Sequence, residues 1–80
     1  MKVSKSQAIL RLYSALAKEK NIDKKIMIKE LNLSNITFNR YLAEIRSYLE
    51  RYEPNYVLVY RRHNDLYVLK EKGAVEKPLG

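Results

Sequence analysis

The fold is decided by the stretch LNLSNITFNRYL, residues 31–42, in which two helical patterns are separated by a very short turn. Asn32 can take the left-handed conformation that ends a helix, and Ser34 is a favourable N-cap for the next helix. The two helices, predicted over residues 23–31 and 34–52, are therefore joined by only about three residues. Such a short connection forces the helices to cross steeply, which is the helix-turn-helix geometry.

The second helix of this pair has one apolar face. Successive residues of an α-helix are rotated by roughly 100° about its axis, which places Phe38, Leu42, Ile45 and Leu49 on one narrow stripe. These four residues are therefore predicted to enter the core. Pro54 disfavours a helical conformation at the residue before it, so this helix should end near Glu53.

A further amphipathic helix is predicted upstream, over residues 4–20. Ser4 with Gln7 forms a capping-box pattern, and Asn21 is the expected left-handed stop. Apolar residues recur at helical spacing at Ile9, Leu12, Tyr13 and Leu16. Asp23 then caps the helix over residues 23–31.

The chain after Pro54 has the composition of strands. β-branched and aromatic residues predict strands over about residues 56–61 and 66–70, joined by a turn in which Asn64 and Asp65 tolerate positive φ. An isolated hairpin is marginal in water, so it must pack on the helices. We therefore expect one α+β domain over residues 1–70, with three helices followed by a two-stranded β-hairpin, and a flexible tail over residues 71–80.

Composition argues against several function classes. The chain has 80 residues, no cysteine and one histidine, His63, so a disulfide scaffold, a zinc finger and a catalytic pair are not expected. Only two glycines are present, which argues against a phosphate-binding loop. We expect no enzyme activity, no cofactor and no metal. Apolar runs fall short of the roughly 20 residues that span a bilayer, so a cytoplasmic protein with no membrane partner is expected.

A net charge of +7 predicts attraction to polyanions, either nucleic acid or an anionic membrane surface. Lys24 and Lys25 occupy the first turn of a predicted helix, where the dipole is positive and lysine is unfavourable. Together with the N–H groups of that turn, they suggest a site for a DNA phosphate. The alternative is that Asp23 compensates and the lysines are merely solvated.

The polar face of the helix over residues 34–52 suits the DNA major groove. The residues predicted to contact base edges are Asn35, Ile36, Asn39 and Arg40. The residues predicted to contact the DNA backbone are Lys24, Lys25, Ser34, Thr37, Arg61 and Arg62. Paired arginines in a turn can also be simply solvated, and Asn35 can be an ordinary first-turn residue.

The stretch over residues 22–69 resembles the winged helix-turn-helix domain at the N-terminus of DeoR-type and WYL-type bacterial transcription regulators. The matching positions are Ser34, Thr37, Phe38, Arg40 and Leu42, after a turn formed by residues 31–34. Residues 67–69, YVL, are similar to the closing strand of the wing. Ile36 and Tyr41 depart from the family pattern. The resemblance implies a DNA-binding transcription regulator, either a fragment lacking its effector domain or a small regulator that needs a partner protein.

The sequence therefore predicts sequence-specific binding of double-stranded DNA, with the third helix in the major groove. A homodimer on a palindromic site is expected from the modest affinity of a single module, although no sequence feature shows it. The alternative is a winged-helix module for protein interaction, with Ile36, Tyr41 and Tyr48 as an apolar docking face. The spacing of Tyr41 and Tyr48 favours a place in the thin core over a docking face. RNA binding is less favoured because no exposed aromatic platform for single strands is evident.

Overall fold

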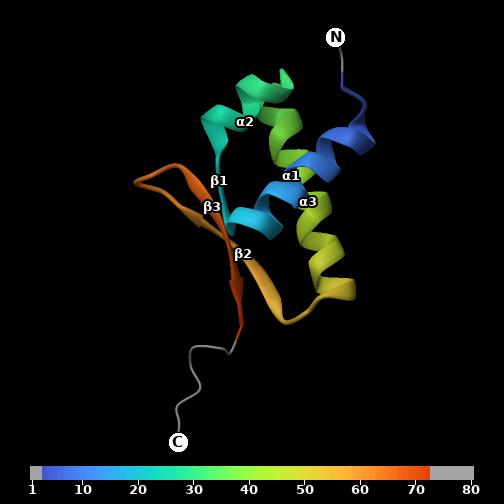
Figure 1. The fold of residues 1–80 in the computed structure, drawn as a ribbon, viewed down its shortest axis with the longest axis vertical. Helices are drawn as coiled ribbons and strands as arrows, with labels where there is room; N and C mark the ends of the chain where they lie inside the picture. The colour runs from blue at the N-terminus through green and yellow to red at the C-terminus, as the bar shows by residue number, and fades with distance from the viewer. Residues whose placement is uncertain (1–2, 73–80) are drawn as a thin grey trace, which may run out of the picture.

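The computed structural model describes residues 3–72, which form three helices and a three-stranded antiparallel sheet (Figure 1). The elements follow one another as α1 (Lys5–Glu19), β1 (Asn21–Asp23), α2 (Lys24–Leu31), α3 (Asn35–Tyr52), β2 (Tyr56–Arg61) and β3 (Leu66–Glu71). The α+β class is therefore confirmed. Of the predicted tail, Glu71 belongs to β3, and residues 73–80 lie outside the described residues.

The predicted N-caps of the three helices and the predicted ends of α2 and α3 are confirmed. Ser4 Oγ accepts a hydrogen bond from the Gln7 amide at 3.2 Å, and Ser34 Oγ accepts one from the Thr37 amide at 3.1 Å. Asn32 ends α2 in the left-handed region, with φ 55°. The Glu53 backbone leaves the helical region directly before Pro54 and ends α3. Local side-chain chemistry thus determines where these elements begin and end.

The predicted stop of α1 at Asn21 is wrong. Lys20 takes the left-handed conformation instead, with φ 66°, and its amide donates to the Leu16 carbonyl at 2.8 Å. Asn21 is already the first residue of β1. A left-handed lysine costs about 1–2 kcal/mol. Tertiary pairing offsets this cost, because the Lys20 carbonyl accepts a hydrogen bond from the Leu69 amide at 2.8 Å.

The sheet has three strands, so the predicted two-stranded hairpin is incomplete. Strand order is β1-β3-β2, and the short strand β1 pairs with β3 through Asn21↔Val68, Ile22↔Tyr67 and Asp23↔Leu66. The hairpin itself pairs Tyr56 with Glu71 through to Arg61 with Leu66. Three residues of sequence NID carry little strand propensity, which is why pattern analysis missed β1.

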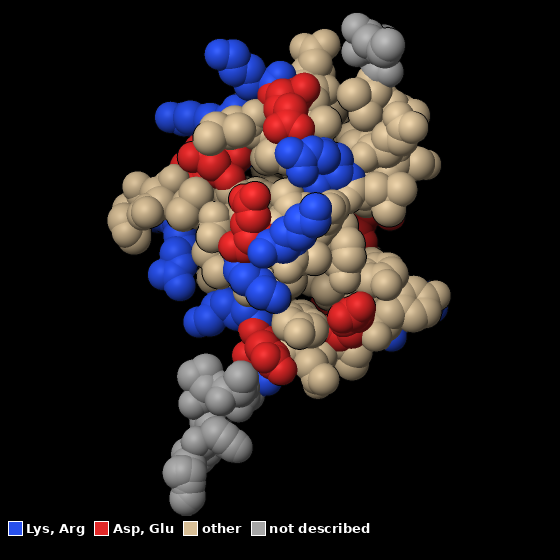
Figure 2. All heavy atoms as spheres, in the orientation of Figure 1, with Lys and Arg blue, Asp and Glu red and all other residues tan. Residues whose placement is uncertain are grey.

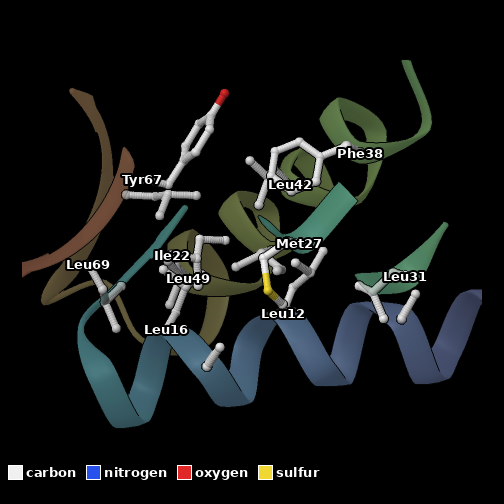
Figure 3. Close-up of a cluster of buried hydrophobic side chains, with 14 residues drawn as sticks. Leu12, Leu16, Ile22, Met27, Leu31, Phe38, Leu42, Leu49, Tyr67 and Leu69 are labelled. Atoms are coloured by element: carbon white, nitrogen blue, oxygen red, sulfur yellow. The ribbon is translucent and has the colours of Figure 1, made fainter. Parts of the chain in front are cut away.

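The core lies between the three helices and one face of the sheet (Figure 3). Phe38 and Leu42 from α3 meet Leu12 and Leu16 from α1, all at 1% exposure or less. The Phe38 ring packs edge-on against Tyr67, with ring centroids 5.7 Å apart. The remaining buried apolar residues are Ala8, Ala15, Ile22, Met27, Leu31, Ile45, Leu49, Leu58 and Leu69. The predicted apolar stripe of α3 is therefore confirmed as a core face.

Candidate nucleic-acid interface

The face of α3 turned away from the core carries the four residues predicted to contact base edges. Asn35, Ile36, Asn39 and Arg40 are all exposed, and Ile36 is 69% exposed. They occupy the first two turns of an 18-residue helix, the part of a helix that reaches base edges in a major groove. An apolar side chain held this far from the core contributes little to folding, so its position is open to a contact role.

Ser34 and Thr37 hold each other at the start of α3. Besides accepting from the Thr37 amide, Ser34 Oγ donates to Thr37 Oγ1 at 3.0 Å. These two hydrogen bonds fix both predicted backbone-contacting side chains at the start of α3.

The start of α2 differs from the predicted phosphate site. Asp23 Oδ1 accepts from the Lys25 amide at 2.9 Å and from the Ile26 amide at 3.3 Å. The Lys24 amide donates to the Asp65 carbonyl at 3.3 Å. The expectation that these N–H groups would be available to an anion is therefore wrong. Only the side-chain ammonium groups of Lys24 and Lys25 are left to attract a phosphate.

One backbone hydrogen bond joins the start of α2 to the hairpin turn. Because Lys24 donates to the carbonyl of Asp65, the first turn of α2 lies against the end of the hairpin turn that carries Arg61 and Arg62. In Figure 1, α2 follows β1 directly at the end of the sheet nearest the hairpin turn. Residues 24–25 and 61–62, far apart in the sequence, thus belong to one region of the surface.

The hairpin turn is also braced to α3 by aromatic contacts. Tyr60 packs on Tyr67 with ring centroids 4.7 Å apart, and Tyr67 in turn packs on Phe38 of α3. The Tyr60 hydroxyl donates to Asp65 Oδ1 at 2.7 Å, a bond that raises the pKa of Tyr60. Asp65 has φ 57°, so the positive φ expected in this turn falls on that residue. These contacts fix the turn relative to α3.

A cation that the sequence pattern does not indicate shares a surface depression with Arg40. Lys5, the first residue of α1, lines a shallow surface depression together with Thr37, Arg40 and Glu44. The Lys5 ammonium lies 3.8 Å from Glu44 Oε2, and both side chains are more than half exposed. No sequence signal places Lys5 there, because the approach depends on how α1 packs on α3. Glu44 partly offsets the positive charge at this end of the face.

Lysine and arginine side chains project from the edge of the molecule formed by α2 and the sheet, whereas both acidic and basic side chains appear on the face toward the viewer (Figure 2). On α1, Arg11 pairs with Glu30 of α2 at 2.8 Å. The face in view is thus of mixed sign, although α1 itself, with Lys5, Arg11 and Lys18 against Glu19, is net positive.

The two tyrosines considered for a docking face behave differently. Tyr41 is half-buried and packs against the core. Tyr48 is 42% exposed and meets Tyr13 of α1 edge-on, with ring centroids 5.6 Å apart. Ile36, Tyr41 and Tyr48 therefore do not share the same degree of exposure, and only Ile36 and Tyr48 offer substantial apolar surface.

Other kinds of site find little support in the part of the chain that the structure describes. Within residues 3–72, no group of three His, Cys, Asp or Glu side chains could hold a metal ion. His63 is exposed in the hairpin turn. Among the helices of these residues, none is long and apolar enough to cross a membrane.

The chain matches no protein-family model, and no curated protein or solved structure matches it either.

Proposed function

We propose that this chain is a winged helix-turn-helix domain that binds double-stranded DNA sequence-specifically and serves in transcriptional regulation. In this proposal α3 enters the major groove, α2 and α3 form the helix-turn-helix, and the β2–β3 hairpin is the wing. The observation that carries it is the exposed start of α3, where Asn35, Ile36, Asn39 and Arg40 face solvent.

Each exposed side chain has chemistry suited to a base edge. An asparagine amide can pair bidentately with adenine, and an arginine guanidinium with guanine. Ile36, whose side chain is 69% exposed, can contact a thymine methyl group, and such a contact would account for an apolar residue at this position. Arg40 is the residue we assign to guanine, because its planar fork of donors matches the two guanine acceptors.

The cations of α2 and the wing would hold the DNA backbone beside this helix. Lys24, Lys25, Arg61 and Arg62 lie in one surface region because the Lys24 amide bonds to Asp65. Ammonium and guanidinium groups contact phosphates without reading sequence, so they supply affinity and orientation. A single module of this kind buries about 600–1,000 Å² on DNA, which gives modest affinity. We therefore include a homodimer on a palindromic site in the proposal.

A salt titration tests the backbone contacts. Fluorescence anisotropy with a random duplex, at about 50 and 200 mM salt, should show affinity falling steeply as salt rises. Replacing Lys24 and Lys25 by alanine should lower the salt slope by about 0.9 per lost phosphate contact. The matched control replaces Lys18 and Lys70, which removes the same charge elsewhere. Salt-independent binding, or equal effects of the two double variants, would contradict the proposed backbone contacts.

Selection of preferred sites from random duplexes tests base readout. Arg40→Ala should relax discrimination at one base pair by about 1–3 kcal/mol, whereas Arg51→Ala, near the far end of α3, should leave the selected sequence unchanged. An unaltered preference in Arg40→Ala would refute the assignment of this residue.

The second candidate is a winged-helix module that binds another protein without reading bases. The observation that favours it is the exposure of Ile36 and Tyr48, at 69% and 42%. The same salt titration separates the two candidates, because a protein-interaction module should attract random DNA through net charge alone, so that the two charge-matched double variants weaken binding equally.

A further inference from the structure

An exposed apolar surface lies between α1 and α3, beside the face of α3 proposed for DNA. Its exposed members are Leu10 of α1, at 65%, and Tyr48 and Tyr52 of α3, at 42% and 66%. Tyr48 and Tyr52 are one helical turn apart, and their ring centroids are 5.1 Å apart. We call Leu10, Tyr48 and Tyr52 the apolar ridge.

The ridge borders a groove whose lining is almost entirely apolar. Leu10 and Tyr48 form part of its wall, together with Ile9, Tyr13 and Ile45. The groove has a volume of about 200 Å³, which leaves room for an apolar side chain. A protruding leucine and a groove that can receive one thus lie side by side on a single face.

The ridge and groove are close to electrically neutral. Glu44, the one charged residue in the groove lining, pairs with Lys5 at 3.8 Å. At the other end, the charge of Glu53, whose Oε2 accepts a hydrogen bond from the Tyr13 hydroxyl at 3.5 Å, is balanced by Lys20, which lines the same surface depression. On a chain of net charge +7, a neutral surface is where two copies can approach with the least mutual repulsion.

We propose that the apolar ridge is the interface of a homodimer with two-fold symmetry. A two-fold interface uses the same patch on both copies, so each must carry both the protruding group and its receptor. This face meets that requirement, because Leu10 of each copy can enter the groove between α1 and α3 of the other. A second copy therefore fits the ridge without any further component.

The exposed area predicts a weak dimer. The three side chains offer roughly 300–400 Å² per copy, about half of the ~800 Å² that each partner contributes to a stable interface. We therefore expect a dissociation constant of tens to hundreds of micromolar, on the order of a transient complex. Because apolar contact drives association and positive charge opposes it, added salt should strengthen the dimer.

Sedimentation equilibrium of the full chain without DNA tests this inference. Between about 10 µM and 1 mM protein, the mean mass should rise from one chain toward two, and more steeply at about 500 mM salt than at 100 mM. Leu10→Glu should weaken association at least tenfold. Ile26→Glu is the matched control, since Ile26 is 61% exposed on α2 and the charge change is identical.

The outcomes are distinct from those of the DNA experiments, because no DNA is present and the salt dependence has the opposite sign. A chain that stays monomeric throughout overturns the proposed interface, as does equal weakening by the two glutamate variants. Association that decreases with salt overturns it too. If circular dichroism shows that Leu10→Glu does not fold, Tyr52→Ser replaces it, and that variant must weaken the dimer for the proposal to stand.

Discussion

Replacing Asp23 by alanine tests how much the start of α2 depends on its cap. The carboxylate accepts from the Lys25 amide at 2.9 Å and the Ile26 amide at 3.3 Å. Loss of an N-cap costs about 0.5–2 kcal/mol. Here both amides can turn to water and the longer bond is weak, so we expect about 1 kcal/mol. For a domain of this size that corresponds to a fall of roughly 4–8 °C in melting temperature.

Asp23→Asn separates capping from charge. The amide oxygen of asparagine can accept the same bonds, so this variant should lose only the interaction with the helix dipole, about 0.3–0.5 kcal/mol. Glu50→Ala removes the same charge from an exposed position on α3 and should change stability by less than about 0.5 kcal/mol. Thermal and urea unfolding followed by circular dichroism measure all three variants. Equal destabilisation by the Ala and Asn variants of Asp23 would show that charge, not capping, is responsible.

Three further measurements address the two faces of α3, the pH dependence and the surface ion pair. Phe38→Ala should destabilise by about 3–5 kcal/mol in urea unfolding and Ile36→Ala by less than about 0.5 kcal/mol; similar losses would mean that the core and solvent faces are misassigned. Burial raises the pKa of Tyr67 above the ordinary 10.0, so stability should be retained below pH 10 and decline as pH rises beyond it, because the unfolded chain ionises first; Tyr67→Phe should flatten that decline in pH-dependent melting curves, and an unchanged curve would refute it. Arg11→Ala breaks the exposed pair with Glu30 and should cost at most about 1 kcal/mol, less at high salt; a larger, salt-insensitive loss would point to packing by the arginine stem.

Features set by local chemistry could be predicted from the sequence. The caps at Ser4, Asp23 and Ser34 depend on one side chain and the next three amides, and the apolar stripe of α3 depends on helical spacing alone. The hairpin strands were also predictable, because their residues have strong strand propensity. All of these lie within a few residues along the chain.

Features set by distant contacts could not be predicted. Strand β1 exists because Asn21–Asp23 pairs with β3, and its own residues give no strand signal. Because of the same pairing, α1 ends at Lys20 in the structure and not at Asn21, where the sequence predicted its end. At the candidate site, the exposure of Arg40 follows from helical spacing, whereas the approach of Lys5 and the bond between Lys24 and Asp65 depend on tertiary packing.

The pairing of β1 with β3 has a consequence for the order of assembly. Residues 21–23, which lead straight into α2, are anchored to residues 66–68, near the end of the described chain. Closing so long a loop carries an entropic cost that is recovered only once both partners are present. During synthesis from the N-terminus, α2 must therefore wait for the last strand before it is locked in position. A nascent chain that stops short of residue 66 can form its helices, but it cannot yet hold the basic end of α2 against the hairpin.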